Sequence, residues 1–207
     1  MLFDDSYQTL AQPVEGQFRD RGSRFLAFAY PIRREADAKL HLDTLRREHP
    51  KANHHCYAYR LGLDKNHYRV SDDGEPNGSA GRPILNTIYS HDRPGVPFTN
   101  ILVVVVRYFG GTLLGVPGLI NAYKTATAEA LAVAQFETLT VNEQYRIRFG
   151  FEQMNAVMRV VKETGLTVLG QSFDTHCTLD IEVRKTAAMN VTERFKSIDG
   201  VSVDWLS

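Results

Sequence analysis

Carboxylate side chains gather in one loop that is rich in glycine and proline. The loop runs from Ser71 to Pro83, and its candidate binding residues are Asp72, Asp73, Glu75, Gly78 and Arg82. A rigid loop of this composition is typical of ligand sites, where backbone amides hold the ligand and carboxylates accept hydrogen bonds or bind a cation. The alternative is a rigid turn in which the Asp side chains cap backbone amides. An EF-hand is excluded, because Pro83 stands at the twelfth position, where a bidentate Glu is required.

A second glycine-rich segment, residues 106–118, links an apolar run to a helical pattern. Its candidate binding residues are Arg107, Tyr108, Gly110, Gly111 and Gly115. A strand, a glycine-rich turn and a helix N-terminus in this order present backbone N–H groups that suit an anion. The spacing of Gly110 and Gly115 imitates a P-loop, but Val116 and Pro117 replace the Lys and Ser/Thr, which argues against hydrolysis of the P-loop type. A tight turn with close helix–strand packing explains the glycines equally well.

The third candidate is the run His54-His55-Cys56. Strand alternation places His54 and Cys56 on one face and His55, Tyr57 and Tyr59 on the other, so His55 and Cys56 make a poor nucleophilic dyad. His54 beside a carboxylate loop suits a general base, and a hydrogen-bonded structural histidine is the alternative. Cys56 and Cys177, the only cysteines, fit small core residues, and no Cys/His spacing predicts a metal site.

The elements that must position these residues lie in the first two thirds of the chain. Ala38, Leu42 and Leu45 predict a helix, residues 54–61 alternate as a strand, and a helix is predicted from about Pro117 to Gln135. The run Ile101–Val106 is continuously apolar and β-branched, which predicts a central strand buried on both faces.

The last third predicts a separate domain. Tyr145, Ile147 and Phe149 alternate as a strand, and the residues from Thr175 to Val183 alternate as another. Helical stripes follow each, and further strands are predicted at 166–169 and 201–205, so the order is β-α-β-β-α-β, the ferredoxin-like plait. Its open face would carry Arg146, Asp180 and other charges of mixed sign without aromatics, unlike an RNA-binding RRM sheet.

Composition narrows the class of protein. The chain has 207 residues, is 43% hydrophobic and carries 24 basic and 24 acidic residues. A zero formal charge lowers the expectation of non-specific duplex binding. With two cysteines, no secretory signal and no long apolar run, we expect a reduced, cytoplasmic protein without membrane contact, metal or cofactor.

The two glycine-rich segments also carry a family resemblance. DDGEPNGSAGRPIL and VVVVRYFGGTLLGVPGLINAY resemble the two signatures of the YigZ/IMPACT family, and SRFLAFAYPI and HPKANHHCYAY match further family segments in the same order. The resemblance covers about residues 14–136. The sequence departs from the family pattern at Pro117 and Asn121, where members often have Gly and Arg.

The resemblance implies an α+β protein of two domains. Residues 1–137 would form an IMPACT-type domain like the second domain of a small-subunit ribosomal protein, with a β-α-β mixed sheet and helices on one side. Residues 138–207 would form a ferredoxin-like domain similar to a plait of elongation factor G. Eukaryotic members regulate translation by competing for a ribosome-associated activator of a starvation-response kinase.

The leading functional hypothesis is therefore a translation-associated binding protein that engages RNA or a ribosomal partner through a cleft between the two glycine-rich segments. Arg82, Arg107 and Lys124 would contact phosphates, and Tyr57, Tyr59 or Tyr108 would stack on bases. The rival hypothesis is a protein that binds an anionic metabolite, or an enzyme of unassigned reaction, using Asp73, Glu75 and His54. Recognition of a protein partner alone is a third. No catalytic constellation in the sequence decides among them.

Overall fold

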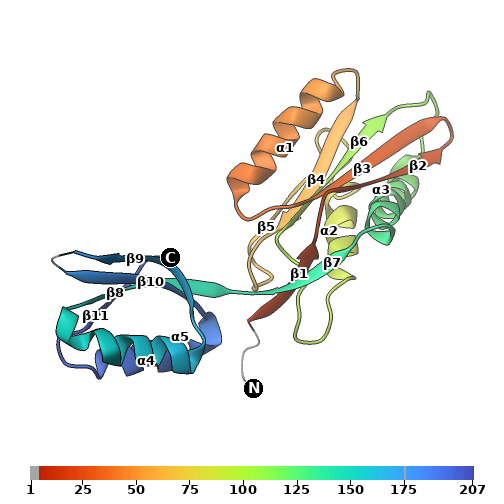
Figure 1. Cartoon of the computed structure of the whole chain (residues 1–207). Coiled ribbons are helices and arrows are strands. Elements are labelled where there is room, and N and C mark those ends of the chain that lie inside the picture. Colours follow the sequence, from red (N-terminus) through yellow and green to blue (C-terminus); the bar gives the residue numbers. More distant parts are fainter. Residues whose placement is uncertain (1–4, 175) are drawn as a thin grey trace. The chain divides into compact units, whose positions relative to one another are not determined.

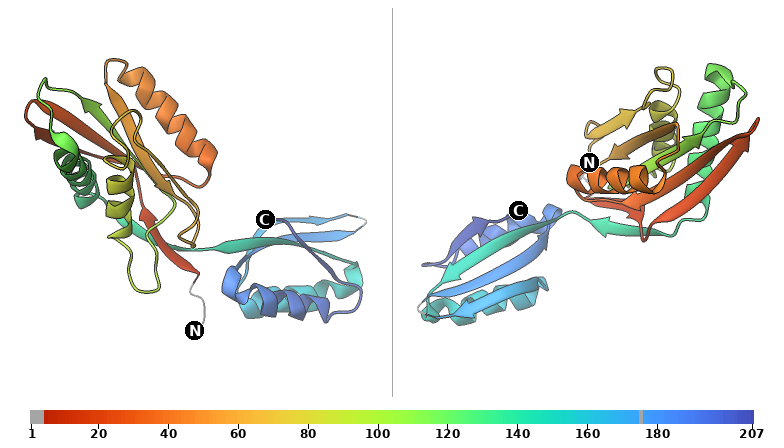
Figure 2. Two further views of the ribbon diagram at one scale, coloured as in Figure 1. Left: turned by 180° about the vertical axis from the view of Figure 1, so that it is seen from behind. Right: turned by 90° about the horizontal axis from the view of Figure 1, so that it is seen from above.

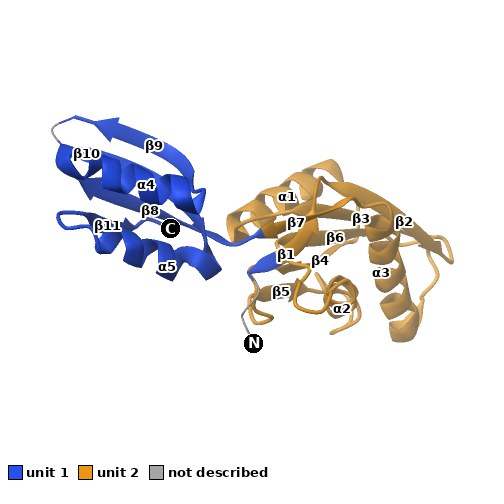
Figure 3. Ribbon diagram, turned by 60° about the horizontal axis from the view of Figure 1, so that its bottom comes forward, with its two compact units in different colours: residues 1–6, 140–207 blue, residues 7–139 orange. Residues whose placement is uncertain are grey.

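The computed structural model describes residues 5–174 and 176–207, which form two compact units (Figure 3). The larger unit contains residues 7–139, and the smaller unit contains residues 140–207 together with Asp5 and Ser6. Thr175, predicted to open a strand, lies outside the described residues. No helix in the described ranges has the length and apolarity needed to span a bilayer.

A five-stranded sheet organises the larger unit (Figure 1). In spatial order its strands are β2 (Val14–Asp20), β3 (Ser23–Pro31), β6 (Ile101–Tyr108), β4 (His54–Arg60) and β5 (Tyr68–Ser71). All four neighbouring pairs are antiparallel. Because β3 and β4 both run antiparallel to β6, they run parallel to each other on either side of it, and helix α1 (Glu35–Glu48) makes the crossover between them.

Strand β6 is the centre of this unit, and its residues from Ile101 to Val106 are fully buried. The prediction of a strand buried on both faces is confirmed. Its alternate residues Leu102, Val104 and Val106 pack with α1, and the intervening Ile101, Val103 and Val105 pack with α2 (Gly81–Tyr89) and α3 (Gly115–Ala132).

The α+β class is confirmed, and two details of the expected sheet differ. The sheet is antiparallel rather than mixed, and its helices cover both faces rather than one (Figure 2). The physical reason is the apolar character of β6 on both sides, which requires cover on both. On the α3 side, Gly16 of β2 allows close approach, since a Cβ there would lie 2.3 Å from the backbone nitrogen of Ala130.

Two short strands outside this sheet were not predicted. β1 (Ser6–Leu10) and β7 (Phe136–Thr140) pair with each other to form a separate two-stranded sheet. Leu10 is fully buried in the core of the larger unit, and the Phe136 ring packs edge-on against Phe98 at 5.3 Å.

The smaller unit is the predicted ferredoxin-like plait. Its elements are β8 (Asn142–Phe149), the short 3-10 turn Phe151–Gln153, α4 (Met154–Thr164), β9 (Thr167–Phe173), β10 (Cys177–Arg184), α5 (Lys185–Lys196) and β11 (Ser202–Trp205). The antiparallel strands lie in the order β11-β8-β10-β9, and both helices pack on one face. On the open face Arg146 forms a bidentate ion pair with Asp180 at 2.7 Å.

Helix α5 is capped by a residue from the other end of the chain. The buried carboxylate of Asp5 accepts hydrogen bonds from the Thr186 backbone N–H at 2.9 Å and the Thr186 hydroxyl at 2.8 Å, and it pairs with Arg184 at 2.5 Å. The first turn of α5 contains no acidic residue of its own. Asp5 therefore supplies the negative charge that stabilises a helix N-terminus.

Candidate functional site

The loop between β5 and α2 is held from inside by Asp72. Its carboxylate accepts hydrogen bonds from the backbone N–H groups of Gly78 at 2.8 Å, Ala80 at 3.0 Å and Gly81 at 2.8 Å. Ala80 and Gly81 lie at the start of α2, so Asp72 caps this helix from outside its own sequence. Of the two interpretations of the loop carboxylates, the capping role holds for Asp72.

Asp73 joins the same loop to β4. It adopts a positive φ of 44°, which Asp tolerates better than most residues. Its carboxylate accepts a hydrogen bond from the His55 backbone N–H at 2.6 Å, and its carbonyl oxygen lies 2.8 Å from His54 Nδ1. Because a carbonyl oxygen only accepts, His54 Nδ1 carries the proton, and Nε2 of the neutral ring is left as an acceptor.

Glu75 is the centre of a buried polar cluster. Its Oε1 accepts hydrogen bonds from Arg107 Nη1 at 2.5 Å and from the Tyr123 hydroxyl at 2.8 Å, and His54 Nε2 lies 3.9 Å away. The side chains of Glu75 and Arg107 are only 4% and 6% exposed. Within the described residues Oε2 makes no hydrogen bond. This oxygen remains able to accept a donor from a ligand.

Cys56 and Tyr123 contact each other in this cluster, and burial stabilises the neutral form of each. The Cys56 thiol lies 2.9 Å from the Asp72 carbonyl oxygen and 3.3 Å from the Tyr123 hydroxyl. Burial raises the pKa of Cys56 and of Tyr123 far above their ordinary values, and the nearby Glu75 carboxylate acts in the same direction on both. Neither group therefore offers an activated nucleophile at neutral pH.

Tyr123 is a site residue that was not predicted from the sequence. Tyr123 lies four residues after Leu119 on the apolar stripe of α3, and both are buried. A tyrosine on an inward stripe needs a partner for its hydroxyl, and that requirement was the available signal.

The turn between β6 and α3 is formed by close backbone approach. A Cβ at Gly110 would lie 1.9 Å from the Gly22 carbonyl carbon, and the Gly110 N–H donates to the Ser23 hydroxyl at 3.1 Å. Gly111 and Gly115 have φ of +89° and +71°, with open space at the Cβ position of Gly111. Tight packing therefore explains Gly110, whereas left-handed backbone explains Gly111 and Gly115.

Tyr108 does not join the other predicted site residues. It follows Arg107 in β6, so its side chain points to the α1 face, where its hydroxyl lies 2.9 Å from His49 Nδ1. Tyr57 and Tyr59 pack on the same α1 face. The expected grouping of these tyrosines with Arg107 is wrong, because adjacent strand residues alternate between faces.

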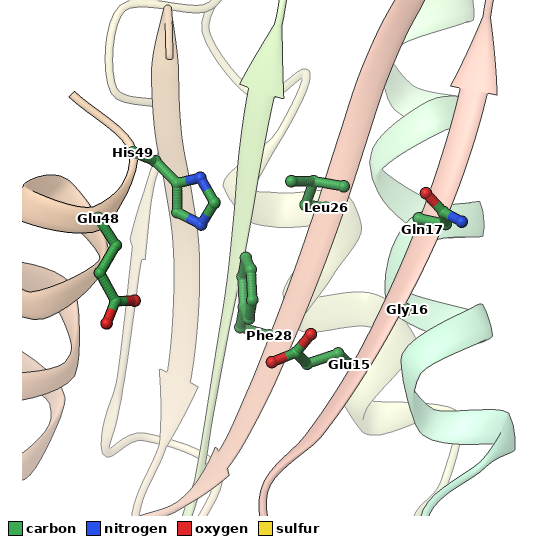
Figure 4. Close-up of a pocket in the computed structure, with 7 residues that line it drawn as sticks. All are labelled: Glu15, Gly16, Gln17, Leu26, Phe28, Glu48 and His49. Carbon is green, nitrogen blue, oxygen red and sulfur yellow. The ribbon is translucent and has the colours of Figure 1, made fainter. Parts of the chain in front are cut away.

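The α1 face carries a hollow of about 590 Å³ (Figure 4). Glu15 and Gln17 of β2 line one wall, and Glu48 and His49 at the end of α1 line the other. Leu26 and Phe28 of β3 form its floor. Among the described residues, its lining includes none from the two glycine-rich segments.

Arg82 and Lys124 lie on the α2–α3 side, with exposed side chains. They line a groove of about 370 Å³ between the two helices, together with Gly78 of the loop and Ile120 of α3. The Arg82 guanidinium also lies 5.5 Å from the centre of the Tyr68 ring. The structure thus brings Gly78, Arg82 and Lys124 together, and it separately brings His54, Glu75 and Arg107 together.

The three carboxylates of the loop accept hydrogen bonds within the protein. Asp72 is committed to backbone amides and Glu75 to Arg107 and Tyr123. Within residues 5–174 and 176–207, no three His, Cys, Asp or Glu side chains gather in a way that would hold a metal ion. Among the described residues, the groups that remain available to a ligand include His54 Nε2, Glu75 Oε2 and the exposed cations of the groove.

Comparison with known proteins shows which family this chain belongs to. The Impact N-terminal domain matches residues 21–131, a span that contains every predicted site residue. The chain is 33% identical to "IMPACT family member" of Haemophilus influenzae, over 73% of this chain and 72% of the relative. The chain belongs to the IMPACT family.

Other members of the IMPACT family show similar coverage. "IMPACT family member YigZ" of Escherichia coli is 34% identical over 74% of each chain, and a Thermus thermophilus member is 42% identical over 65% of this chain and 69% of its own length. A crystal structure described as that of a hypothetical protein is similar at a TM-score of 0.70 with 27% identity, and the match covers 98% of this IMPACT-family chain and 97% of that one.

Proposed function

We propose that this IMPACT-family protein is a translation-associated regulatory protein that acts by binding, and that it engages RNA or a ribosome-associated protein through the Ser71–Pro83 loop and the turn after β6. Family membership supports the translational role, because eukaryotic members are expected to regulate translation. The observation that carries the binding role is the internal commitment of the carboxylates: Asp72 caps α2 and Glu75 pairs with Arg107.

The cations available for phosphate contact are Arg82 and Lys124 rather than Arg107. Arg107 is buried against Glu75, with its guanidinium 5.4 Å from the Phe25 ring centre and 5.5 Å from that of Phe109. Arg82 and Lys124 are exposed and share one groove. Exposed cations of this kind can neutralise phosphates and release counterions.

The test is binding to ribosomes and to single-stranded RNA over a salt series, with the full chain. We expect binding that weakens with salt, and a salt slope that falls by about one for each of Arg82→Ala and Lys124→Ala if each contacts a phosphate. Lys39→Ala is the matched control, since Lys39 is exposed on α1, the helix of the opposite face. Absence of binding at every salt concentration would overturn the proposal.

A second candidate, binding of a small anionic metabolite, is favoured by one observation. His54 Nε2 and Glu75 Oε1 lie 3.9 Å apart, and the Asp73 carbonyl orients the imidazole. Both His54 Nε2 and Glu75 Oε2 accept hydrogen bonds, so a hydroxyl or amine of such a metabolite would donate to them, and binding would raise the melting temperature by mass action. A panel of phosphorylated and carboxylated metabolites tests this by thermal shift, and a response that persists in His54→Ala would exclude this site.

A further inference from the structure

The outer surfaces of α2 and α3 carry unusually little charge. Their only charged residues are Arg82, Lys124 and Glu129. The backbone of Glu129 packs against Gly16 of β2, and Glu129 does not line the groove between the helices. The outward face of α2 and α3 therefore consists mainly of apolar and small residues, and two cations lie beside the groove.

The outward row of α3 follows an i, i+4 spacing. It consists of Val116, Ile120, Lys124, Ala128 and Ala132, all of them exposed. Just before the helix, Leu113 is 81% exposed. A helix face that meets only water normally carries several charged residues. This row resembles instead the face of a helix that packs against another helix, with alanines that permit close approach.

The two hydroxyls that line the groove beside this row are hydrogen-bonded within the protein. The Thr87 hydroxyl donates to the Pro83 carbonyl at 2.9 Å, and the Ser90 hydroxyl donates to the Thr87 carbonyl at 2.7 Å. Pro83 and Ile120 supply apolar lining. An apolar occupant can therefore displace water from this groove without leaving those hydroxyls unpaired, whereas Arg82 and Lys124 favour negative charge at its margin.

We propose that the α2–α3 groove and the outward row of α3 form the docking site for an amphipathic helix of a partner protein, with acidic side chains opposite Arg82 and Lys124. Helix α3 has 18 residues, so at about 1.5 Å per residue it offers roughly 27 Å of contact length. Aliphatic side chains such as Leu113 and Ile120 favour a helix over RNA, because bases stack on aromatic rings. The inference rests on the proposed binding role and names the partner class for one part of that surface.

The experiment uses the full chain and two synthetic helical peptides of about 18 residues. Both carry Leu at i, i+4, i+7 and i+11; one has Glu along the flanks of that stripe, and the other has Lys at the same positions. Fluorescence anisotropy measures binding of each peptide to wild type, Ile120→Ser and the double variant Arg82→Glu/Lys124→Glu. Ile120 is 40% exposed, so Ile120→Ser should fold, and circular dichroism checks this.

We expect wild type to prefer the acidic peptide by about 10-fold or more, Ile120→Ser to weaken that binding by about 10-fold, and the double variant to prefer the basic peptide. Equal binding of both peptides, or no binding, overturns the inference. If the variants lose ribosome or RNA binding while wild type ignores both peptides, the inference fails and the proposed function stands. If wild type is a dimer that Ile120→Ser dissociates, the occupant is a second copy and the inference also fails.

Discussion

At the scale of single residues, the site is governed by one buried ion pair. Glu75 and Arg107 come from the loop and from the central strand, and their contact joins two segments that lie 32 residues apart. A buried pair of this kind contributes little net stability relative to apolar residues, but removal of one partner leaves an uncompensated charge.

We therefore expect Arg107→Ala to lower the free energy of unfolding by about 3–5 kcal/mol, because Glu75 would remain buried without its cation. Urea denaturation followed by circular dichroism measures the change. The matched control is the double variant Glu75→Gln/Arg107→Met, which removes both charges. Its free energy of unfolding should fall by less than that of Arg107→Ala alone. An equal or larger loss in the double variant would show that packing, rather than the unpaired charge, sets the cost.

Neighbouring glycines of the turn after β6 provide a second comparison. Gly110→Ala should cost about 1–3 kcal/mol, because the added Cβ meets backbone atoms of Gly22 and Ser23 that cannot swing aside. Gly111→Asn should be nearly neutral, since Asn tolerates the left-handed backbone and the Cβ position is open. Urea midpoints of the two variants decide this, and a larger loss for Gly111→Asn would contradict the assignment.

At the scale of elements, the Asp5 cap on α5 makes part of the stability depend on pH. Burial alone would raise the pKa of Asp5, but hydrogen bonds from Thr186 and the Arg184 guanidinium outweigh it and lower the pKa below its ordinary value of 3.8. A lowered pKa in the folded state means that Asp5 stabilises the fold above the ordinary value, and that this contribution is lost as pH falls from there through the folded-state value.

Asp5→Asn should therefore lower the free energy of unfolding by about 1–3 kcal/mol at pH 7. The decrease should be clearly smaller at pH 3, where wild type has itself lost part of the stability that Asp5 contributes. Urea titrations of wild type and variant at the two pH values measure the difference. Asp180→Asn is the matched control, because its ion pair with Arg146 lies on the open face of the same unit and should contribute at most about 1 kcal/mol. A loss for Asp5→Asn that is the same at both pH values would contradict the electrostatic role.

The elements also show what the sequence could and could not predict. The run Ile101–Val106 predicted β6 because a continuously apolar β-branched segment has few alternatives, and alternation predicted the plait strands. The face that α1 covers could not be predicted, because a single apolar stripe fits either side of a sheet. β1 and β7 were missed because their pairing joins segments more than a hundred residues apart, and neither has clear alternation.

The candidate site likewise has features that the sequence could predict and features that it could not. Adjacent positions in a strand point to opposite faces, so the separation of Arg107 and Tyr108 follows from the sequence alone. The role of Asp72 could not be predicted, because whether a loop carboxylate meets its own backbone or a ligand depends on φ and ψ along the entire loop. The contact of Tyr123 with Glu75 required the register of α3 against the sheet.

At the scale of the whole molecule, the two units have separate cores. The buried cluster of the smaller unit draws on residues from Ile147 to Phe195, and those of the larger unit on residues from Leu10 to Leu131. Distant sites without shared partners have additive effects on stability. The cluster around Glu75 and the cap on α5 belong to different units.

We expect calorimetry of the full chain to resolve two transitions, with Arg107→Ala lowering the midpoint of one and Asp5→Asn lowering the midpoint of the other. In the double variant, both midpoints should move as in the single variants. A single transition that both substitutions shift would show instead that the units unfold as one cooperative body.

The cap on α5 has a consequence for the order in which the two units fold during synthesis. Asp5 leaves the ribosome about 180 positions ahead of its partners Arg184 and Thr186. The larger unit can close its core once residue 139 has emerged, but the smaller unit must wait for its own strands and then recruit Asp5, which emerges ahead of the larger unit. Folding of the smaller unit therefore depends on the segment around Asp5 staying free until Arg184 and Thr186 have emerged.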